Sequence, residues 1–326
     1  MRMWRGLLIG AICVWAGGAW SLARGAELPR RETGDGAVEA EAFDLNSELG
    51  PRVLFEKESL YHYIVVEEDA GVRRMRFRRA GEHFEESVIS VKEPLNLHFG
   101  YYEQMFAGFA FVPAPKDVLL VGLGGGTLAI VMHHYFPEVN IDNVELDPDV
   151  VHAAKAYFGF KENKRVKVYV RDGRVQTRVL GRGGKRYDMI LLDAFRGGYI
   201  PYHLTTREYM EQVKSLLRPG GVVVSNLRSG FASYHYQRRT MAKVFPYQWE
   251  SDGGGNVIVV TSAARQPLKR ETLMKNARRL QKSKEFTFDL PSIIERGESP
   301  GDYETSGRIL TDDFAPTDVL RGIPAE

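Results

Sequence analysis

Three acidic residues, Glu145, Asp172 and Asp193, lie at the ends of short apolar runs in the sequence. The runs are rich in β-branched residues, which is typical of buried strands. In an open sheet of parallel strands, ligands bind beyond the carboxyl ends of the strands. The three carboxyl groups are therefore candidate site residues, able to accept hydrogen bonds from ligand hydroxyl or amino groups.

A glycine-rich turn precedes the first of these acids. The apolar run 118–121 leads into glycines at positions 122, 124, 125 and 126, and Glu145 follows about twenty residues later. Glycine lets the backbone turn sharply and approach a ligand closely. Strand, glycine turn, helix, strand and acid in this order predict a nucleoside site in which Glu145 meets the ribose hydroxyls, although a glycine-rich turn alone can be only a tight turn.

From residue 117 onward, predicted strands and helices alternate. We expect strands at residues 118–121, 141–146, 166–170, 189–192, 222–225 and 256–261. We expect helices ending at residue 135 and at residues 150–158, 176–180, 206–217 and 234–244, with Thr205 or Thr206 as the cap of the fourth. This alternation predicts an α/β fold with a mostly parallel sheet covered by helices on both faces.

A smaller unit is expected before this domain. Segments 59–67, 72–79 and 85–91 predict an antiparallel sheet, and apolar residues at helical spacing predict a helix over 94–111. The second strand carries arginines at positions 73, 74, 76, 78 and 79. They could bind a polyanion, but a solvated or edge strand defended by charge is the preferred interpretation.

The first residues look like a secretory signal. Arg2 and Arg5 precede an uncharged apolar stretch over residues 7–23, and Ser21 and Ala23 are the small residues that a signal peptidase reads. Cleavage after Ala23 would leave an exported protein without cysteine, which suits a bacterial periplasm, where disulfides are optional. An uncleaved stretch would be a membrane anchor. The polar residues 24–50 predict a flexible linker.

Charge and cysteine content exclude several kinds of site. A formal net charge of +2 over 326 residues gives no case for nucleic acid as a partner. The single cysteine, Cys13, lies in the predicted signal, so the mature chain has no thiol nucleophile and no cysteine-ligated metal. His133 and His134 lie in a predicted helix without a matching acid pair, and no metal is expected there.

The glycine turn and the motifs VELDP, RDGR, YDMILLDAF and LRPGG occur in the order and spacing of class I S-adenosylmethionine-dependent enzymes. More narrowly, the chain resembles the spermidine synthase (polyamine aminopropyltransferase) family. The resemblance implies a class I methyltransferase-like Rossmann domain with a small N-terminal antiparallel β domain, and a homodimer. The expected division is a signal peptide 1–23, a linker 24–50, a β-rich domain with its connecting helix 51–112, a Rossmann-like catalytic domain 113–265, and a C-terminal helix and tail 266–326.

The resemblance also implies roles for single residues. Nucleoside binding is implied for Gly122, Gly124, Gly126, Glu145, Asp172 and Gly173, with the last two facing adenine. Asp193 matches the first aspartate of the family's D-S-S-D-P motif, the base that takes a proton from an attacking amine, and Tyr102 matches the tyrosine of Y-H-E-M. Attack on the carbon beside a sulfonium needs a neutral amine, so a carboxylate must hold the amine and remove its proton. Alternatively, Asp193 only caps the loop after its strand.

The sequence departs from the family where an amine acceptor would bind. Gly125 replaces the aspartate of G-G-G-D-G-G, His62 the glutamine of Y-Q, Glu103 the histidine of Y-H-E-M, and Arg196 the second aspartate of D-S-S-D-P. A cation at position 196 should repel a diamine. Tyr199, Tyr202 and His203 could line the acceptor pocket or pack a surface loop.

Three functions remain open on this basis. The first is aminopropyl transfer from decarboxylated S-adenosylmethionine to a small-molecule amine, with an acidic cleft built from Asp193, Glu103 and Asp312 or Asp313. The second is methyl transfer from S-adenosylmethionine to an amine or another small nucleophile, because Gly125 would not repel the cofactor's carboxylate. The third is an exported nucleoside-binding protein without turnover.

Overall fold

The computed structural model describes residues 50–316, except residues 80, 197, 265–267 and 301–305. The expected signal peptide, and the expected linker up to residue 49, lie outside the described residues. Among the helices that are described, none is both long and apolar enough to cross a membrane.

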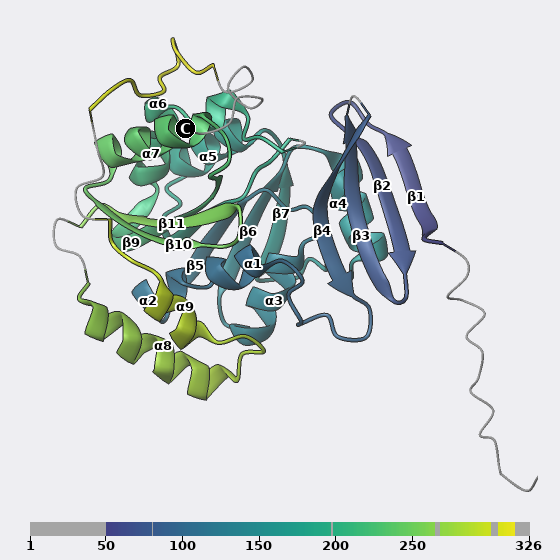
Figure 1. The fold of residues 1–326 in the computed structure, drawn as a ribbon, viewed down its shortest axis with the longest axis horizontal. Coiled ribbons are helices and arrows are strands. Elements are labelled where there is room, and N and C mark those ends of the chain that lie inside the picture. The colour runs from purple at the N-terminus through teal and green to yellow at the C-terminus, as the bar shows by residue number, and fades with distance from the viewer. Residues whose placement is uncertain (1–49, 80, 197, 265–267, 301–305, 317–326) are drawn as a thin grey trace, which may run out of the picture. The chain divides into compact units, whose positions relative to one another are not determined.

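A seven-stranded sheet forms the larger part of the fold, with strand order β10-β11-β9-β8-β5-β6-β7 (Figure 1). Five neighbouring strands are parallel: β5 (Asp117–Val121), β6 (Asn140–Glu145), β7 (Val166–Val170), β8 (Tyr187–Leu192) and β9 (Leu217–Arg228). The last two, β10 (Tyr247–Asp252) and β11 (Asn256–Ser262), are antiparallel, and β10 was not predicted. The mostly parallel α/β fold expected from the sequence is confirmed.

Helices cover both faces of this sheet, as the apolar strands require. Val118 and Leu120 of β5 pack toward α1 (Gly100–Met105), α2 (Gly108–Phe111), α3 (Thr127–Tyr135), α8 (Arg270–Lys284) and α9 (Leu290–Arg296). Leu119 and Val121 pack toward α5 (Gly173–Arg182), α6 (Arg207–Ser215) and α7 (Ser233–Val244). Successive side chains of a strand point to opposite faces, so β5 is buried on both sides.

The helix expected over residues 94–111 is wrong in its extent. Helix α1 begins only at Gly100, and Phe106 and Ala107 separate it from α2. Residues 94–99 form turns and bends instead, and Asn96 closes one of them by donating from its backbone N–H to the carbonyl oxygen of Glu93 at 3.0 Å. The short α1 matters for the site because it fixes which side chains of residues 101–104 face inward.

The N-terminal sheet has four strands where three were expected: β1 (Arg52–Glu58), β2 (Tyr63–Asp69), β3 (Val72–Arg79) and β4 (Glu82–Ser90). The strand expected over 59–67 is wrong at its start, because Ser59 and His62 close a turn through a backbone hydrogen bond of 2.8 Å. Helix α4 (Pro148–Tyr157) packs on this sheet through Val150 and Ala153.

Of the two arrangements expected for the arginine-rich strand, a solvated strand or an edge strand, the edge strand is wrong, because β3 is an inner strand of that sheet. Its charges are balanced across the sheet instead, by the ion pairs Arg73–Glu68, Arg74–Glu85, Arg76–Glu67 and Arg78–Glu56. Opposite charges on neighbouring strands stabilise a solvated sheet face. The cluster is therefore explained without a polyanion.

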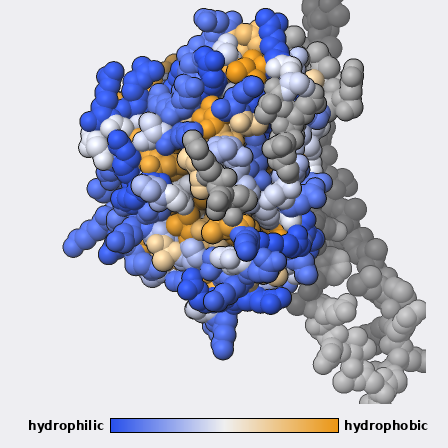
Figure 2. Space-filling view, turned by 90° about the vertical axis from the view of Figure 1, so that its left-hand side faces the viewer, coloured by the Kyte–Doolittle hydropathy of each residue, from blue (hydrophilic) through white to orange (hydrophobic). Residues whose placement is uncertain are grey.

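The outer surface seen from the left of Figure 1 is mainly hydrophilic, and hydrophobic residues show there as smaller areas between charged ones (Figure 2). This agrees with the burial of apolar side chains on β9, β10 and β11, such as Val224, Trp249 and Ile258.

Candidate active site

A pocket lies beyond the carboxyl ends of β5, β6 and β8, where it also meets the N-terminal sheet. The larger sheet and its loops contribute residues of the glycine turn together with Glu145, Asp172, Gly173 and Asp193. The N-terminal part contributes His62, Phe77, Glu86, Ser87, Tyr101 and Tyr102. As expected from the binding of ligands beyond the carboxyl ends of parallel strands, Glu145, Asp172 and Asp193 line one pocket.

Gly122 closes the end of β5 against Asp193. Its φ is 101°, and a Cβ atom there would lie 2.2 Å from the carbonyl oxygen of Asp193. Any other residue would push the two strand ends apart. Gly122 and Gly124 both line the pocket, whereas Gly126 caps α3 and lies against the ring of Phe160, away from the pocket wall.

Glu145 lies at the end of β6 with its side chain almost fully buried. The backbone N–H groups of Leu123 and Asp147 each donate to one of its carboxylate oxygens at 3.0 Å. Burial raises the pKa of Glu145, and these two donors oppose that shift. Each oxygen retains a further lone pair that a ligand hydroxyl could use.

His62 is a pocket residue that the sequence indicated only as a departure from a family motif. Its Nδ1 lies 3.0 Å from Oδ2 of Asp147, which is fully buried, and its ring stacks on Phe77 with centroids 4.0 Å apart. Asp147 also caps α4 by accepting from the N–H of Asp149 at 2.9 Å. A buried acid thus fixes a histidine of the N-terminal sheet beside Glu145.

Asp172 and His203 form a second oriented pair on the pocket wall. Asp172 caps α5 by accepting from the N–H of Val175 at 2.9 Å, and its Oδ2 lies 2.7 Å from Nε2 of His203. The hydrogen bond with His203 is the main cause that lowers the pKa of Asp172. The 3-10 turn η1 (Tyr202–Leu204) carries His203 to this place.

Asp193 directly follows the last residue of β8 and lines the pocket. Nδ2 of Asn226 donates to its Oδ1 at 2.9 Å. Burial raises the pKa of Asp193 to about 7, although the hydrogen bond from Asn226 opposes this shift. A carboxyl group with such a pKa can exchange a proton near neutral pH.

Two tyrosines of α1 stand beside Asp193. Burial, followed by the charge of Asp193, raises the pKa of both Tyr101 and Tyr102, so both phenols stay protonated. The hydroxyl of Tyr102 lies 3.4 Å from Oγ of Ser87. Tyr102 was expected in the site; Tyr101 was not, because the start of α1 could not be read from the sequence.

Four expected contributors to the acceptor site lie elsewhere. Glu103 is not on the pocket wall; it is half-buried toward Arg296, since α1 turns it away from Tyr101 and Tyr102. Tyr199 is buried within its loop rather than lining the pocket. Asp312 is paired with Arg174, and neither it nor Asp313 reaches the pocket. Arg196 does line the pocket and is exposed.

Gly125 leaves no room for the aspartate that the family pattern would place there. Its N–H donates to Oγ of Ser87 at 2.7 Å. A Cβ atom at this position would lie 2.6 Å from the ring of Phe158 and 3.0 Å from Cβ of Ser87. The packing around the glycine turn therefore excludes an aspartate at position 125.

A second hollow, the outer groove, adjoins the pocket through Glu86, Tyr101 and Phe195, which line both. Its other walls include aromatic and polar side chains: Phe84, His98, Phe99, Asn226, Arg228 and Asn256. Asn226 links the two spaces directly, since it lines the groove and holds Asp193. Within the described residues, no group of three or more His, Cys, Asp or Glu side chains could hold a metal ion.

Known proteins are similar to this chain in sequence. A spermine/spermidine synthase domain profile matches residues 99–249. The polyamine aminopropyltransferase of Vibrio vulnificus is 33% identical over 276 residues, which cover 82% of this chain and 91% of that protein. Human eEF1A lysine and N-terminal methyltransferase is 34% identical over 143 residues, which cover 39% of this chain and 20% of that protein.

Solved structures share the fold. Spermidine synthase from Thermotoga maritima has a TM-score of 0.58 and 21% identity, over 75% of this chain and 83% of that chain. Human methyltransferase-like protein 13, in complex with SAH, has a TM-score of 0.52 and 28% identity, over 57% of this chain and 92% of that chain. With the long match to the Vibrio vulnificus protein, these likenesses confirm the resemblance: the chain belongs to the spermine/spermidine synthase family of transferases.

Proposed function

We propose that this protein transfers an aminopropyl group from decarboxylated S-adenosylmethionine to an amine acceptor. The observation that carries the proposal is the place of Asp193. It lines the pocket together with Glu145 and Asp172, it accepts a hydrogen bond from Asn226, which lines the outer groove, and burial brings its pKa to about 7. The name of the Vibrio vulnificus relative, a polyamine aminopropyltransferase, agrees with this assignment.

In the proposed reaction, the acceptor nitrogen attacks the aminopropyl carbon next to the sulfonium. The new N–C bond forms as the C–S bond breaks, and the electron pair of the C–S bond neutralises the sulfonium to leave methylthioadenosine. Asp193 takes the proton that the nitrogen loses. Alignment of the two reactants supplies much of the remaining acceleration.

The nucleoside would be held by residues of the inner pocket. Glu145 would accept hydrogen bonds from the ribose hydroxyls, and Asp172 with Gly173 would face adenine. His62, held by Asp147, adds a ring at the side of the N-terminal sheet. These roles agree with the general place of nucleosides at the carboxyl ends of parallel strands.

The acceptor side differs from the family pattern. Glu103 does not reach it, and Arg196 adds a cation to the pocket wall. Besides Asp193, Glu86 lines both the pocket and the outer groove, and its carboxyl group could attract a cationic amine. The aromatic rings of Tyr101, Phe99 and Phe84 could pack on the carbon chain of the acceptor amine or face the charge of its ammonium group.

Methyl transfer from S-adenosylmethionine is a second candidate, favoured by Gly125. Because residue 125 is a glycine, it has no carboxylate to repel the carboxylate that distinguishes S-adenosylmethionine from its decarboxylated form. The packing of Phe158 and Ser87 against Gly125 keeps that place free of a side chain. The similarity to the human methyltransferase over 143 residues agrees with this candidate.

Calorimetric titration of residues 24–326 with S-adenosylmethionine, its decarboxylated form and methylthioadenosine separates the candidates. Tighter binding of the decarboxylated cofactor supports aminopropyl transfer, and tighter binding of S-adenosylmethionine supports methyl transfer. Binding of none of the three would contradict both.

Turnover tests the role of Asp193. With decarboxylated S-adenosylmethionine and a panel of amines, Asp193→Asn should lower kcat by about 10²–10⁴-fold, because a positioned general base is lost. Its affinity for methylthioadenosine should stay within about twofold, below 1 kcal/mol. Glu103→Gln is the matched control and should keep its activity. Full turnover in Asp193→Asn would leave only a binding or capping role for this residue.

We also infer export, from the apolar stretch over residues 7–23 and the arginines before it. Fractionation of a bacterium expressing the full chain should place it in the periplasm, with Arg24 as its first residue. Recovery from the cytoplasm with an intact N-terminus would contradict export.

A further inference from the structure

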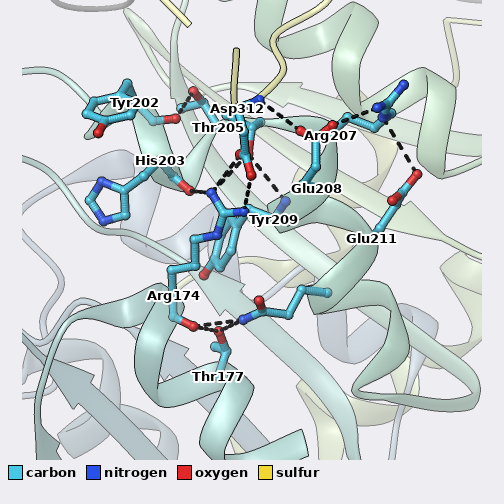
Figure 3. A network of polar contacts seen from close by, with 12 residues as sticks. Arg174, Thr177, Tyr202, His203, Thr205, Arg207, Glu208, Tyr209, Glu211 and Asp312 are labelled. Carbon is cyan, nitrogen blue, oxygen red and sulfur yellow. Dashed lines mark hydrogen bonds and ion pairs between the residues drawn. The ribbon is translucent and has the colours of Figure 1, made fainter. Parts of the chain in front are cut away.

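A polar network outside the pocket ties the C-terminal segment to the pocket wall (Figure 3). Its centre is Arg174, the second residue of α5, which directly follows the pocket residues Asp172 and Gly173. Nη1 and Nη2 of Arg174 donate to Oδ1 and Oδ2 of Asp312 at 2.7 and 2.6 Å. Such a two-pronged pair fixes both direction and distance, which a single point charge does not.

The same guanidinium also holds the segment that carries His203. Nη1 of Arg174 donates to the carbonyl oxygen of His203 at 3.3 Å, and Oγ1 of Thr206 donates to Asp312 at 2.8 Å. The ring of His203 in turn contacts Asp172 at 2.7 Å. Three contacts therefore lead from Asp312, outside the pocket, through Arg174 and His203 to the carboxylate of Asp172 on the pocket wall.

The C-terminal segment is itself anchored independently of Arg174. Leu310 is fully buried; its N–H donates to Oγ1 of Thr240 at 2.9 Å and its carbonyl accepts from the N–H of Arg207 at 2.9 Å. The N–H of Asp312 donates to Oε2 of Glu208 at 3.0 Å. Helices α6 and α7 thus hold the backbone around Asp312 in place, and its carboxylate presents a fixed partner to Arg174.

We propose that Asp312 is a positioning residue for nucleoside binding, acting through Arg174 on residues 202–206 and on Asp172. The inference rests on the proposed nucleoside site, but not on which group is transferred. The Arg174 side chain is only 16% exposed. Without the Asp312 carboxylate, this partly buried cation loses its pair and must find new partners, which releases the His203 carbonyl.

The first experiment measures methylthioadenosine affinity by calorimetry in Asp312→Asn. The variant should bind about three- to tenfold more weakly, a loss of less than about 1.4 kcal/mol. Asp313→Asn is the matched control: it removes the same charge one residue away, where the side chain is exposed and has no ion pair among the described residues. Equal affinity in the two variants would overturn the proposal.

Three further variants distinguish positioning from general destabilisation. Asp312→Glu keeps the carboxylate and should recover most of the affinity. Arg174→Met and the double variant Arg174→Met/Asp312→Asn should bind equally weakly, because the two residues act as one unit. Additive losses in the double variant would show that Asp312 acts independently of Arg174.

Hydrogen exchange of the ligand-free protein provides a readout that needs no nucleoside. Amide protons of residues 202–206 should exchange several-fold faster in Asp312→Asn than in Asp313→Asn, while those of β5 and β8 stay unchanged. Uniformly faster exchange would indicate simple destabilisation and overturn the proposal. If the unmodified protein bound no nucleoside, the proposed function would fail, whereas this exchange experiment would still test the link between Asp312 and the segment.

Discussion

Burial and chemistry make opposite demands on Asp193. Burial favours the neutral acid, whereas a base must be ionised before it can take a proton. The single donor from Asn226 does not offset burial, so the pKa settles at about 7 rather than near that of a solvated aspartate. An ordinary aspartate would be ionised at every physiological pH but would be a weaker base.

The first prediction at the residue scale concerns the rate. If Asp193 is the base, kcat/KM should rise about tenfold per pH unit below pH 7 and level off above it, because only the carboxylate accepts a proton. Initial rates between pH 5.5 and 9 at several acceptor concentrations measure this dependence of kcat/KM on pH. A rate that is flat between pH 5.5 and 7 would assign the proton transfer to another group.

The second prediction concerns the free energy of unfolding. The folded pKa of Asp193, about 7, lies above the ordinary value of about 3.9 in an unfolded chain. The folded state therefore holds an extra proton in this window, and its contribution to stability is lost as pH rises from about 4 to about 7. Asp193→Asn stays neutral throughout, so it should stabilise the protein more at pH 8 than at pH 5, by on the order of 1–3 kcal/mol. Urea unfolding at the two pH values tests this. If Asp193→Asn changed the free energy of unfolding equally at both, ionisation of Asp193 would not destabilise the folded protein.

At the scale of elements, the glycine turn is shaped by its neighbours as much as by its own sequence. Ser87 of β4 accepts from the N–H of Gly125, and Phe158, which ends α4, fills the space beside it. The turn therefore connects the two sheets as well as β5 and α3. The ring of Phe158 stands where the family's aspartate side chain would begin.

Restoring that aspartate should consequently fail. Gly125→Asp should cost about 1–3 kcal/mol of unfolding free energy by overpacking against Phe158, and it should weaken rather than strengthen binding of the decarboxylated cofactor. Gly230→Ala is the control, since a Cβ atom there meets nothing within 4 Å. Denaturant unfolding and calorimetry measure both effects. A gain in affinity for the decarboxylated cofactor would show that Phe158 moves aside easily.

The sequence predicted the elements with strong local patterns. Short apolar runs that alternate with helical segments predicted the parallel strands, and ligand binding beyond the carboxyl ends of such strands predicted that Glu145, Asp172 and Asp193 share one site. Thr206, one of two threonines expected to cap α6, does so by accepting from the N–H of Tyr209. These features depend on residues that are close in the chain.

The sequence did not predict which side chains of the short helix α1 face the pocket, or which residues far apart in the chain form pairs. Tyr101 and Tyr102 of α1 line the pocket whereas Glu103 does not, and residue spacing alone does not show which side of so short a helix faces the pocket. The pair of Arg174 and Asp312 joins residues 138 positions apart, and no local pattern announces such a contact. The buried pair of His62 and Asp147 likewise joins two sheets.

At the scale of the molecule, the pocket is shared by the N-terminal sheet and the larger sheet. His62 and Ser87 come from one side, and Glu145 and Asp193 from the other. A ligand in this pocket touches both and should stabilise their contact. The expected homodimer remains a prediction, which sedimentation can test.

We therefore expect saturating methylthioadenosine to slow hydrogen exchange in β4 and in β5 together, and to raise Tm. At a concentration about 100-fold above Kd, ligand binding stabilises a protein by about 2.7 kcal/mol. Ser87→Ala should reduce the protection of β4 more than that of β6, since it removes the link to Gly125. Protection confined to the larger sheet would show that the N-terminal sheet takes no part in binding.

The anchoring of Leu310 and Asp312 has a consequence for the time at which the protein becomes competent. The strands and helices that carry Glu145, Asp172 and Asp193 all precede residue 226 in the chain, whereas Asp312, which braces the Asp172 wall through Arg174, follows them. Chains fold from the N-terminus as they emerge. A chain that has not yet emerged as far as Asp312 can thus build the larger part of the sheet while its pocket is still unbraced, and we expect firm binding in the proposed nucleoside site only after Asp312 is in place.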